Sequence, residues 1–222
     1  MMDTKPIPPV RPSRARARIY NAALRLFAES GGSAISVSDL ADAAGIARGT
    51  IYNNVSEPRN LLGEVAGALS QEMLLRTEAT MLTITDPVER MATGVRLFVR
   101  RAHEDHNWGR FMVQFTLSHA TLRGVMREPP SRDIALAVDA GRFKIVADQI
   151  PAYVSMLTGT TIAAMNTVLR GEQTWRDAGS SAAEFLLRAA GISGAEARRI
   201  SRRELPPLAA EQGKNPKRRR TG

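Results

Sequence analysis

The sequence predicts an all-α protein, and three observations support this fold class. Apolar side chains recur at intervals of three and four residues along most of the chain, which is the period of an amphipathic helix. Alternation of apolar and polar residues, the signature of a half-buried strand, is nowhere sustained. Glycine and proline divide the apolar stripes into segments of helical length. The chain of 222 residues is long enough to bury a substantial core.

The expected helices follow from these stripes in chain order. The first covers 14–30 and ends at Gly31-Gly32. The second covers 38–44, with Ser38 as its cap, and the third covers 48–54, after the break at Gly45. The remaining helices are expected over 58–82, 86–105, 107–127, 129–141, 148–170, 174–190 and 194–203.

Composition and charge exclude several classes of protein. The chain has no cysteine, so disulfides, thiolate metal sites and cysteine nucleophiles are excluded. No apolar run reaches the roughly 18 residues of a membrane span, and we expect a cytoplasmic protein with no membrane partner. The net charge is +9 and is concentrated at the two ends, over 1–18 and 195–222, while the body between them is close to neutral. Basic ends favour a polyanionic partner such as nucleic acid.

Residues 37–56, VSDLADAAGIARGTIYNNVS, contain a helix-turn-helix pattern centred on Gly45. Ala41 must be small because two helices cross there, and Gly45 must reach left-handed backbone angles in the turn. The residues expected to hold this unit together are Leu40, Ala41, Gly45, Ile46 and Ile51. The second helix then presents its outer face to a DNA major groove. The residues on that face are Arg48, Gly49, Thr50, Asn53 and Asn54, and arginine and asparagine are well suited to reading base edges.

Residues 14–62 resemble the DNA-binding domain of the TetR family of transcriptional regulators. The matching segments are IYNAALRLFAESG (19–31), ISVSDLADAAGIARGTIYNNV (35–55) and LL (61–62). Beyond them, the resemblance is one of helical architecture. The family commonly has a phosphate-contacting lysine where this chain has Pro58. Either Arg59 replaces that lysine, or the backbone N–H groups at the start of the following helix contact the phosphate instead. Arg14, Ser38 and Tyr52 complete the expected set of DNA-contacting residues.

The resemblance implies an N-terminal three-helix, helix-turn-helix domain and a C-terminal helical bundle for effector binding and dimerisation. We expect a disordered basic arm over 1–13, the DNA-binding domain over 14–57, the effector and dimerisation domain over 58–205, and a disordered basic tail over 206–222. The implied function is that of a ligand-responsive repressor, a homodimer that binds a palindromic double-stranded DNA operator and releases it when a small-molecule effector binds. The resemblance implies no cofactor, no bound metal and no catalytic residue.

A stripe of aromatic residues suggests where an effector would bind. Trp108, Phe111, Phe115 and His119 lie at i, i+3, i+7 and i+11 of one predicted helix. Together with Phe98 and Met156 they are the expected walls of an apolar pocket, with His119 as its polar anchor. Ordinary core packing is the alternative explanation of the same stripe.

Small residues in the eighth and ninth helices permit close helix packing. In the TetR family the corresponding helices form a four-helix interface between two protomers. The residues expected there are Gly159, Ala163, Ala182 and Ala183. Packing within one protomer is the alternative.

Two other functional classes remain open from the sequence. His103 and His106 are spaced i, i+3 with two carboxylates between them, so a helical metal-binding or enzymatic protein is one alternative. No third ligand follows at a fixed spacing. The other alternative is a protein that coats nucleic acid through its basic ends, without sequence preference and with steep salt dependence.

Overall fold

The structure is a computed structural model that describes residues 14–30, 35–55 and 61–210. These residues form α-helices and one short 3₁₀ turn, and none of them is in a strand. The predicted all-α fold class is confirmed. The predicted arm over 1–13, Arg59 and the basic tail from residue 211 onward lie outside the described residues.

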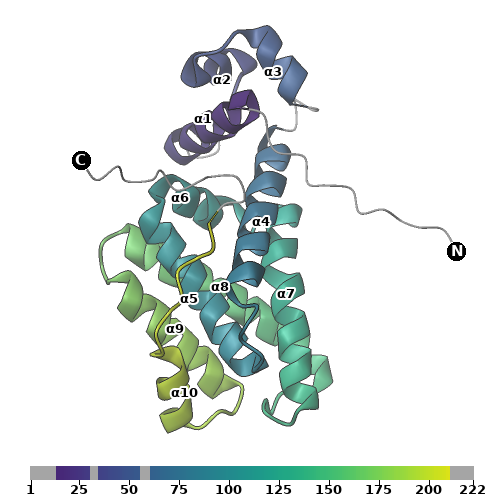
Figure 1. The fold of residues 1–222 in the computed structure, drawn as a ribbon, viewed down its shortest axis with the longest axis vertical. Coiled ribbons are helices and arrows are strands. Elements are labelled where there is room, and N and C mark those ends of the chain that lie inside the picture. Colours follow the sequence, from purple (N-terminus) through teal and green to yellow (C-terminus); the bar gives the residue numbers. More distant parts are fainter. Residues whose placement is uncertain (1–13, 31–34, 56–60, 211–222) are drawn as a thin grey trace, which may run out of the picture.

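Three short helices form a head at one end of the long axis (Figure 1). They are α1 (Arg14–Ser30), α2 (Val37–Ala44) and α3 (Arg48–Asn54). The next helix, α4 (Leu61–Thr80), runs from the head down into a larger helical body (Figure 1). The body also contains α5 (Pro87–Glu104), α6 (His106–Phe115), α7 (Ala120–Asp139), the 3₁₀ turn η2 (Ala147–Gln149), α8 (Ile150–Leu169), α9 (Trp175–Ala189) and α10 (Gly194–Ser201).

Helix α2 begins one residue earlier than predicted, and its cap is Ser36 instead of Ser38. The Ser36 hydroxyl accepts from the Asp39 backbone N–H at 3.1 Å, and the Asp39 carboxylate accepts from the Ser36 backbone N–H at 3.2 Å. This reciprocal capping box satisfies two donors that a helix start leaves free. Ser38 lies inside the first turn, so its predicted capping role is wrong.

The region 107–141 departs most from the prediction. The helix expected over 107–127 ends at Phe115, and a new helix, α7, begins at Ala120 and continues through Pro129 and Pro130 to Asp139. A proline inside a helix removes a backbone donor and releases the carbonyl four residues earlier. The carbonyl that Pro130 releases, that of Met126, lies 3.4 Å from the Thr158 hydroxyl of α8, whose single proton is shared with the closer Val154 carbonyl at 2.9 Å.

Two clusters of buried apolar residues hold the molecule together. One cluster is continuous from the head into the upper body and includes Ile19, Phe27 and Ile51 together with Trp108 and Phe111. The other fills the lower body, where α9 packs chiefly on α5. Because the first cluster crosses the boundary predicted at 57/58, the head and the body share one apolar core.

The chain after α10 packs back onto α4, contrary to the prediction that disorder begins at residue 206. Leu205 and Leu208 lie against the first apolar cluster. The Ala209 backbone N–H donates to the Thr80 hydroxyl at 2.8 Å, and the Ala209 carbonyl accepts from Arg76 at 2.6 Å. Apolar burial and backbone hydrogen bonds therefore order residues 206–210, and the Pro206-Pro207 pair does not mark the end of packed structure.

Candidate nucleic-acid interface and ligand cavity

The turn between α2 and α3 is built around Gly45. Its φ of 60° and ψ of 44° lie in the left-handed region, as the sequence pattern requires. The Ile46 backbone N–H donates to the Ala41 carbonyl at 3.0 Å and closes the turn. From α1, the Arg18 guanidinium donates to the carbonyls of Ala44 at 2.7 Å and Gly45 at 2.9 Å. Arg18 thus satisfies carbonyls at the end of α2 and fixes α1 against the turn.

The residues predicted to hold the helix-turn-helix together lie where the pattern put them. Leu40, Ala41 and Ile51 are buried, and Ile46 is half-buried against the same apolar cluster. Their burial fixes α3 on α1 and α2, which orients the opposite face of α3 outward.

That outer face of α3 carries most of the predicted DNA-contacting residues. Arg48, Gly49, Tyr52 and Asn53 are exposed, and Tyr52 retains 61% of its accessible surface. Thr50 and Asn54 are half-buried, and the Asn54 amide donates to the Thr50 carbonyl at 2.9 Å. Arg14, at the first turn of α1, is exposed, and Ser38 is half-buried in α2.

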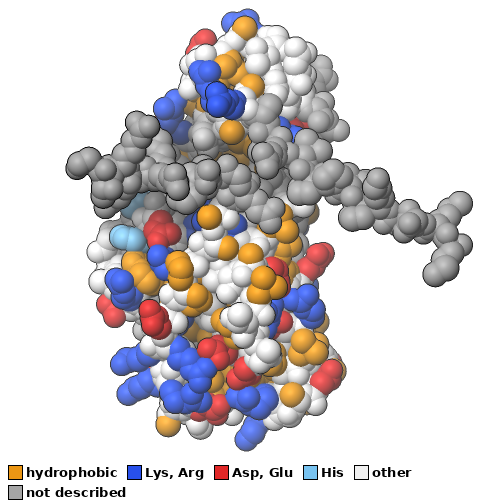
Figure 2. All heavy atoms as spheres, in the orientation of Figure 1, with side chains coloured by type: hydrophobic (Ala, Val, Ile, Leu, Met, Phe, Trp, Pro, Cys, Tyr) orange, Lys and Arg blue, Asp and Glu red, His pale blue; other side chains and the backbone are white. Residues whose placement is uncertain are grey.

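The described part of the head contains more basic than acidic side chains. It has five arginines, one of them on α3, and three acidic residues. Figure 2 shows basic side chains mainly on the side of the head where α1 and α2 lie in Figure 1. An excess of basic over acidic side chains is the charge balance expected of a duplex-binding unit.

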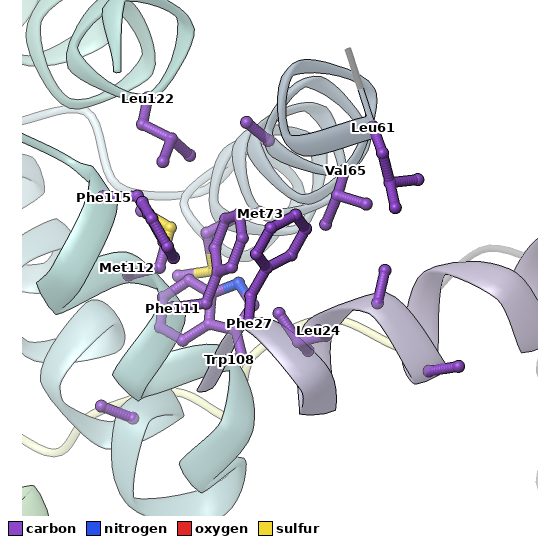
Figure 3. Close-up of a cluster of buried hydrophobic side chains, with 14 of the residues drawn as sticks. Leu24, Phe27, Leu61, Val65, Met73, Trp108, Phe111, Met112, Phe115 and Leu122 are labelled. Carbon is purple, nitrogen blue, oxygen red and sulfur yellow. The ribbon is translucent and has the colours of Figure 1, made fainter. Parts of the chain in front are cut away.

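Two of the predicted pocket residues, Phe111 and Phe115, instead join the head to the body. Phe27 of α1 meets Phe111 and Phe115 of α6 edge-on, with ring centroids 5.8 Å and 5.7 Å apart (Figure 3). Phe111 and Trp108 have no exposed surface, and Phe115 has 7%. The aromatic stripe is therefore packed core, and the prediction that it walls a pocket is wrong. The physical reason is that α1 packs across α6 and covers the stripe (Figure 3).

A cavity lies deeper in the body, between α4, α5, α7 and α8. Its lining is mainly apolar, and Phe98 is the one predicted pocket residue among its walls. The lining residues are Leu74, Thr77, Glu78, Met81, Arg90, Met91, Gly94, Val95, Phe98, Met126, Pro129, Pro130, Asp133, Leu157 and Thr161.

An ion-pair network forms one end of this cavity. Arg90 of α5 donates through Nε to both carboxylate oxygens of Asp133 on α7 at 3.1 Å, and through Nη2 to Glu78 of α4 at 3.0 Å. Its Nη1 donates to the Met81 carbonyl at 3.1 Å. Burial raises the pKa of the Asp133 carboxyl, and the Arg90 charge opposes that shift. The network ties α4, α5 and α7 together.

The other predicted pocket residues lie outside this cavity. Met156 keeps 41% of its surface exposed on the outer side of α8, so it walls no cavity, and its prediction is corrected. His119 stands at the N-terminus of α7 and lines no part of the cavity, because the helix break at 116–119 moves it away from the aromatic stripe. Its Nδ1 atom is buried and has no hydrogen-bond partner among the residues that the structure describes.

The four residues predicted for a dimer interface divide into two pairs. Ala163 is exposed and Gly159 half-buried on α8, with no atom within 4 Å of a Cβ built at Gly159. Ala182 and Ala183 of α9 are buried at 5% and 0%. They belong to the lower apolar cluster, where α9 packs on α5, so their place in an interface is corrected to packing within the protomer.

His103 and His106 are the candidate residues of the metal-binding alternative. The His103 and His106 rings are 6.3 Å apart, and within the described ranges no group of three or more His, Cys, Asp or Glu side chains could hold a metal ion. None of the described helices combines the length and the apolar character needed to cross a membrane.

The cavity's polar residues are the functional candidates that the sequence analysis missed. Asp133 lies on an apolar stripe of α7 with Met126, Pro130 and Ala137, spaced i, i+4, i+7 and i+11. A single carboxylate on such a stripe must find a buried partner, because an unpaired buried charge is very costly. The place of Asp133 on an apolar stripe could have indicated a buried ion pair, although the sequence does not show that its partner is Arg90.

Comparisons with known proteins agree with this arrangement. Residues 19–54 match the family described as bacterial regulatory proteins, tetR family, and residues 86–203 match the tetracyclin repressor-like C-terminal domain. The HTH-type transcriptional repressor KstR2 of Mycolicibacterium smegmatis is 29% identical over 86 residues, which are 39% of this chain. That match spans 42% of the length of KstR2.

Solved structures extend the likeness over most of the chain. The structure of RolR in complex with resorcinol is 29% identical, covers 88% of this chain and 96% of RolR, and has a TM-score of 0.68. RolR without ligand is 28% identical, with 87% and 100% coverage and a TM-score of 0.66. The fatty acid degradation regulator FadR from Bacillus halodurans shares the fold at 19% identity, over 80% of this chain and 96% of FadR, with a TM-score of 0.68.

Proposed function

Because the chain belongs to the TetR family of bacterial transcriptional regulators, we propose that it is a ligand-responsive repressor that binds a palindromic operator as a homodimer. The observation that carries the proposal is the exposed face of α3, which presents Arg48, Tyr52 and Asn53 on a basic head. The proposal assigns DNA binding to residues 14–57 and effector binding and dimerisation to residues 58–205.

Operator binding needs two α3 helices at a spacing of about one turn of duplex, roughly 34–36 Å. In this proposal Asn53 and Arg48 read base edges, whereas Arg14 contacts phosphate. Arg59, at the start of the segment that leads into α4, would contact phosphate where the family commonly has a lysine. Two protomers related by a two-fold axis would make the preferred sequence palindromic.

The outer faces of α8 and α9 support the homodimer. A stripe along α8 contains no charged residue and consists of Ala152, Met156, Gly159, Ala163 and Asn166. On α9, which packs against α8, Phe185 keeps 61% of its surface exposed within one protomer. An uncharged helical stripe and an exposed aromatic side chain on neighbouring helices suit a contact with a second copy of the chain.

The cavity between α4, α5, α7 and α8 supports a small-molecule effector. RolR, the relative described above, has been solved with resorcinol, a small aromatic compound. A ligand in this cavity would touch α4, the helix that leaves the head, and could thereby bias the spacing of the two heads. A tenfold loss of operator affinity needs a coupling free energy of about 1.4 kcal/mol, which is within the usual range.

Selection from a random duplex library tests the DNA-binding proposal. We expect the full chain to enrich a palindrome, and Asn53→Ala to relax preference at one or two base positions in each half-site, at about 1–3 kcal/mol each. Arg14→Ala should weaken binding to all sequences and flatten its salt dependence. Arg127→Ala, an exposed arginine on α7, is the matched control and should change neither property.

Enrichment of no palindrome would overturn the repressor proposal. Binding that ignores sequence and falls steeply with salt would instead favour the nucleic-acid-coating alternative suggested by the basic chain ends.

A further inference from the structure

We propose that the body cavity binds a small, neutral ring compound carrying a hydroxyl group, such as a phenol, through the Thr77 hydroxyl and the Asp133 carboxylate. The proposal rests on the function proposed above and specifies the effector's chemical class. The volume of the cavity, an unpartnered hydroxyl, and the protein hydrogen bonds of the lining arginine each narrow that class.

The size of the cavity favours a single ring. The cavity has a volume of about 60 Å³. An apolar cavity of about 150 Å³ accommodates benzene. A single ring would therefore fit only with a small outward shift of the lining side chains, and a long acyl chain or a fused polycyclic compound would need a much larger one.

Thr77 supplies a hydroxyl that lacks a partner in the described structure. It lies on α4, lines the cavity and is 7% exposed, and its Oγ1 atom makes no hydrogen bond to any described residue. Leaving a buried hydroxyl unsatisfied costs free energy, so such groups ordinarily have partners. A hydroxyl both donates and accepts, and a ligand hydroxyl in the cavity would supply the missing bond.

The charged end of the cavity favours a ligand that donates a hydrogen bond. Arg90 donates from Nε, Nη1 and Nη2 to four protein acceptors, so one of its five N–H groups remains for a ligand. It therefore cannot form a two-bond pair with a ligand carboxylate without releasing one of these acceptors. Asp133 has lone pairs left after accepting from one Arg90 nitrogen. The two carboxylates of the lining are balanced by Arg90 and by Arg132, which lies 3.3 Å from Glu78, so this end of the cavity has no unpaired positive charge to attract an anion. A neutral ligand with a hydroxyl donor can bind to Asp133 and needs neither Arg90 nor an unpaired positive charge.

The two proposed anchors lie on different helices. Thr77 is part of α4, whose other end joins the head, and Asp133 is part of α7. A ligand that bonds to both would add a contact between these helices beside the existing Arg90 network. Because the strength of that contact depends on where α4 lies, the ligand would bind one position of α4 more tightly than another. A ligand can shift a conformational equilibrium only through such a difference in affinity.

Calorimetric titration of the purified full chain tests the ligand class without DNA. The probes are phenol, the three benzenediols, benzoate and toluene. We expect phenol or a benzenediol to bind more tightly than toluene, and benzoate to bind most weakly. Thr77→Val keeps the side chain's shape and removes only the hydroxyl, so it should weaken binding of the best hydroxylated probe about 3- to 10-fold and leave toluene unchanged.

Two further variants separate ligand recognition from folding. Ser70→Ala removes another buried, unpartnered hydroxyl of α4 that does not line the cavity, and it should leave all affinities unchanged. Gly94 lines the cavity, and a Cβ built there has no atom within 4 Å. Gly94→Leu should therefore fill the space and abolish binding, while thermal unfolding shows that the chain still folds.

The outcomes distinguish this inference from the proposed function. Equal affinity for phenols and toluene, preference for benzoate, an unchanged Thr77→Val affinity or no binding by any probe would each overturn the ligand class. Each of these results leaves the repressor proposal intact if the library selection still enriches a palindrome. Failure of that selection would instead overturn the repressor function.

Discussion

At the scale of single residues, the capping box of Ser36 and Asp39 sets where α2 begins. The Ser36 hydroxyl donates to the Asp39 carboxylate at 2.6 Å, in addition to the two backbone bonds of the box. This hydroxyl bond and the Ser36 backbone N–H lower the pKa of the Asp39 carboxyl, since both stabilise its charged form. Helix α2 positions α3, so the capping box contributes to the geometry of the proposed DNA-reading face.

We predict that Ser36→Ala destabilises the protein by about 1 kcal/mol at neutral pH because α2 loses its cap. The lowered pKa of Asp39 means that its share of this stability is present above its ordinary value of 3.8 and is lost as pH falls through the lowered pKa. The gap between wild type and variant should therefore narrow in acid, as measured by denaturant unfolding from pH 7 to pH 3.

Ser193→Ala provides the matched control for this prediction. Ser193 caps α10 by accepting from the Glu196 N–H at 3.3 Å, and the Glu196 carboxylate pairs with Arg142 at 2.8 Å. The Ser193 hydroxyl accepts from the Glu196 backbone N–H and makes no hydrogen bond to the Glu196 carboxylate among the described residues, so this variant's stability deficit should stay constant over that pH range. If the loss of unfolding free energy in Ser36→Ala did not change with pH, the charged Asp39 carboxylate would not contribute to the stability of the cap.

Local patterns explain which single residues could be predicted. Gly45, Ala41 and Ile51 occupy their predicted roles because a tight turn and a close helix crossing constrain residue type within a few positions. The cap was misassigned because Ser36 and Ser38 are both plausible caps, and only the Asp39 side chain three residues after Ser36 completes the box.

At the scale of elements, helix ends in the body were harder to predict than those in the head. The helix expected over 107–127 has no glycine or proline near Phe115, and its break depends on the packing of α6 beneath α1. The Pro129-Pro130 pair is typical of a helix start, yet α7 passes through it, and the carbonyl that Pro130 releases lies 3.4 Å from the Thr158 hydroxyl of α8. A local pattern contains no information about such contacts between helices.

The segment after α10 leads to a prediction about two truncations. Removing 211–222 should leave stability unchanged and reduce only salt-sensitive, non-specific DNA binding, because that part carries the basic run of Lys217 and Arg218–Arg220. Removing 206–222 also deletes the burial of Leu208 and the hydrogen bonds of Ala209 to α4, and should cost about 2–4 kcal/mol. Denaturant unfolding and filter binding measure the two effects separately.

Equal stability of the two truncations would show that residues 206–210 contribute nothing to the fold. A change of preferred base sequence in the shorter truncation would show that the tail reads DNA directly, contrary to the expectation that it adds only sequence-independent affinity.

At the scale of the whole molecule, the location of the cavity could not be inferred from the sequence. Aromatic residues attract attention as ligand walls, yet Phe111 and Phe115 were needed to join the head to the body. The cavity instead depends on four helices meeting around Gly94 and the proline pair of α7, which are inconspicuous residues. Phe98, which was predicted from the sequence, lines the cavity because it lies on α5, the same helix as Gly94.

The proposed dimer gives a prediction at this scale. Ala163→Arg places a long charged side chain in the uncharged stripe of α8, and burying a charge without a partner is strongly unfavourable. We expect monomers by light scattering at micromolar concentration and weak binding to a full palindrome. Ala195→Arg, at an exposed alanine of α10, is the matched control and should remain dimeric. Wild-type protein that is monomeric under the same conditions would contradict the proposed interface.

In the proposed function, ligand binding in the cavity affects the position of the head through the shared apolar core. Helix α4 lines the cavity at Leu74 and Thr77, and it contacts the head through the Tyr20 hydroxyl, which lies 3.5 Å from the Glu64 carboxylate. The second junction is the aromatic triangle of Phe27, Phe111 and Phe115. A close-packed junction transmits a displacement of one part to the other, because packed interiors have little free volume to absorb it.

We predict that loosening the triangle weakens the effect of ligand on DNA binding while leaving each binding event intact. Phe27→Leu removes the edge-on ring contacts across the head–body junction and should cost about 1–2 kcal/mol of stability. Phe143→Leu is the matched control, since Phe143 is 4% exposed and meets Tyr153 edge-on in the lower cluster, outside the junction. Both variants should bind the ligand like wild type. Only Phe27→Leu should lower the ratio of operator affinities without and with saturating ligand, as measured by fluorescence anisotropy. An equal loss of this ratio in both variants would assign the effect to general destabilisation, and an unchanged ratio in Phe27→Leu would leave α4 as the sole route between cavity and head.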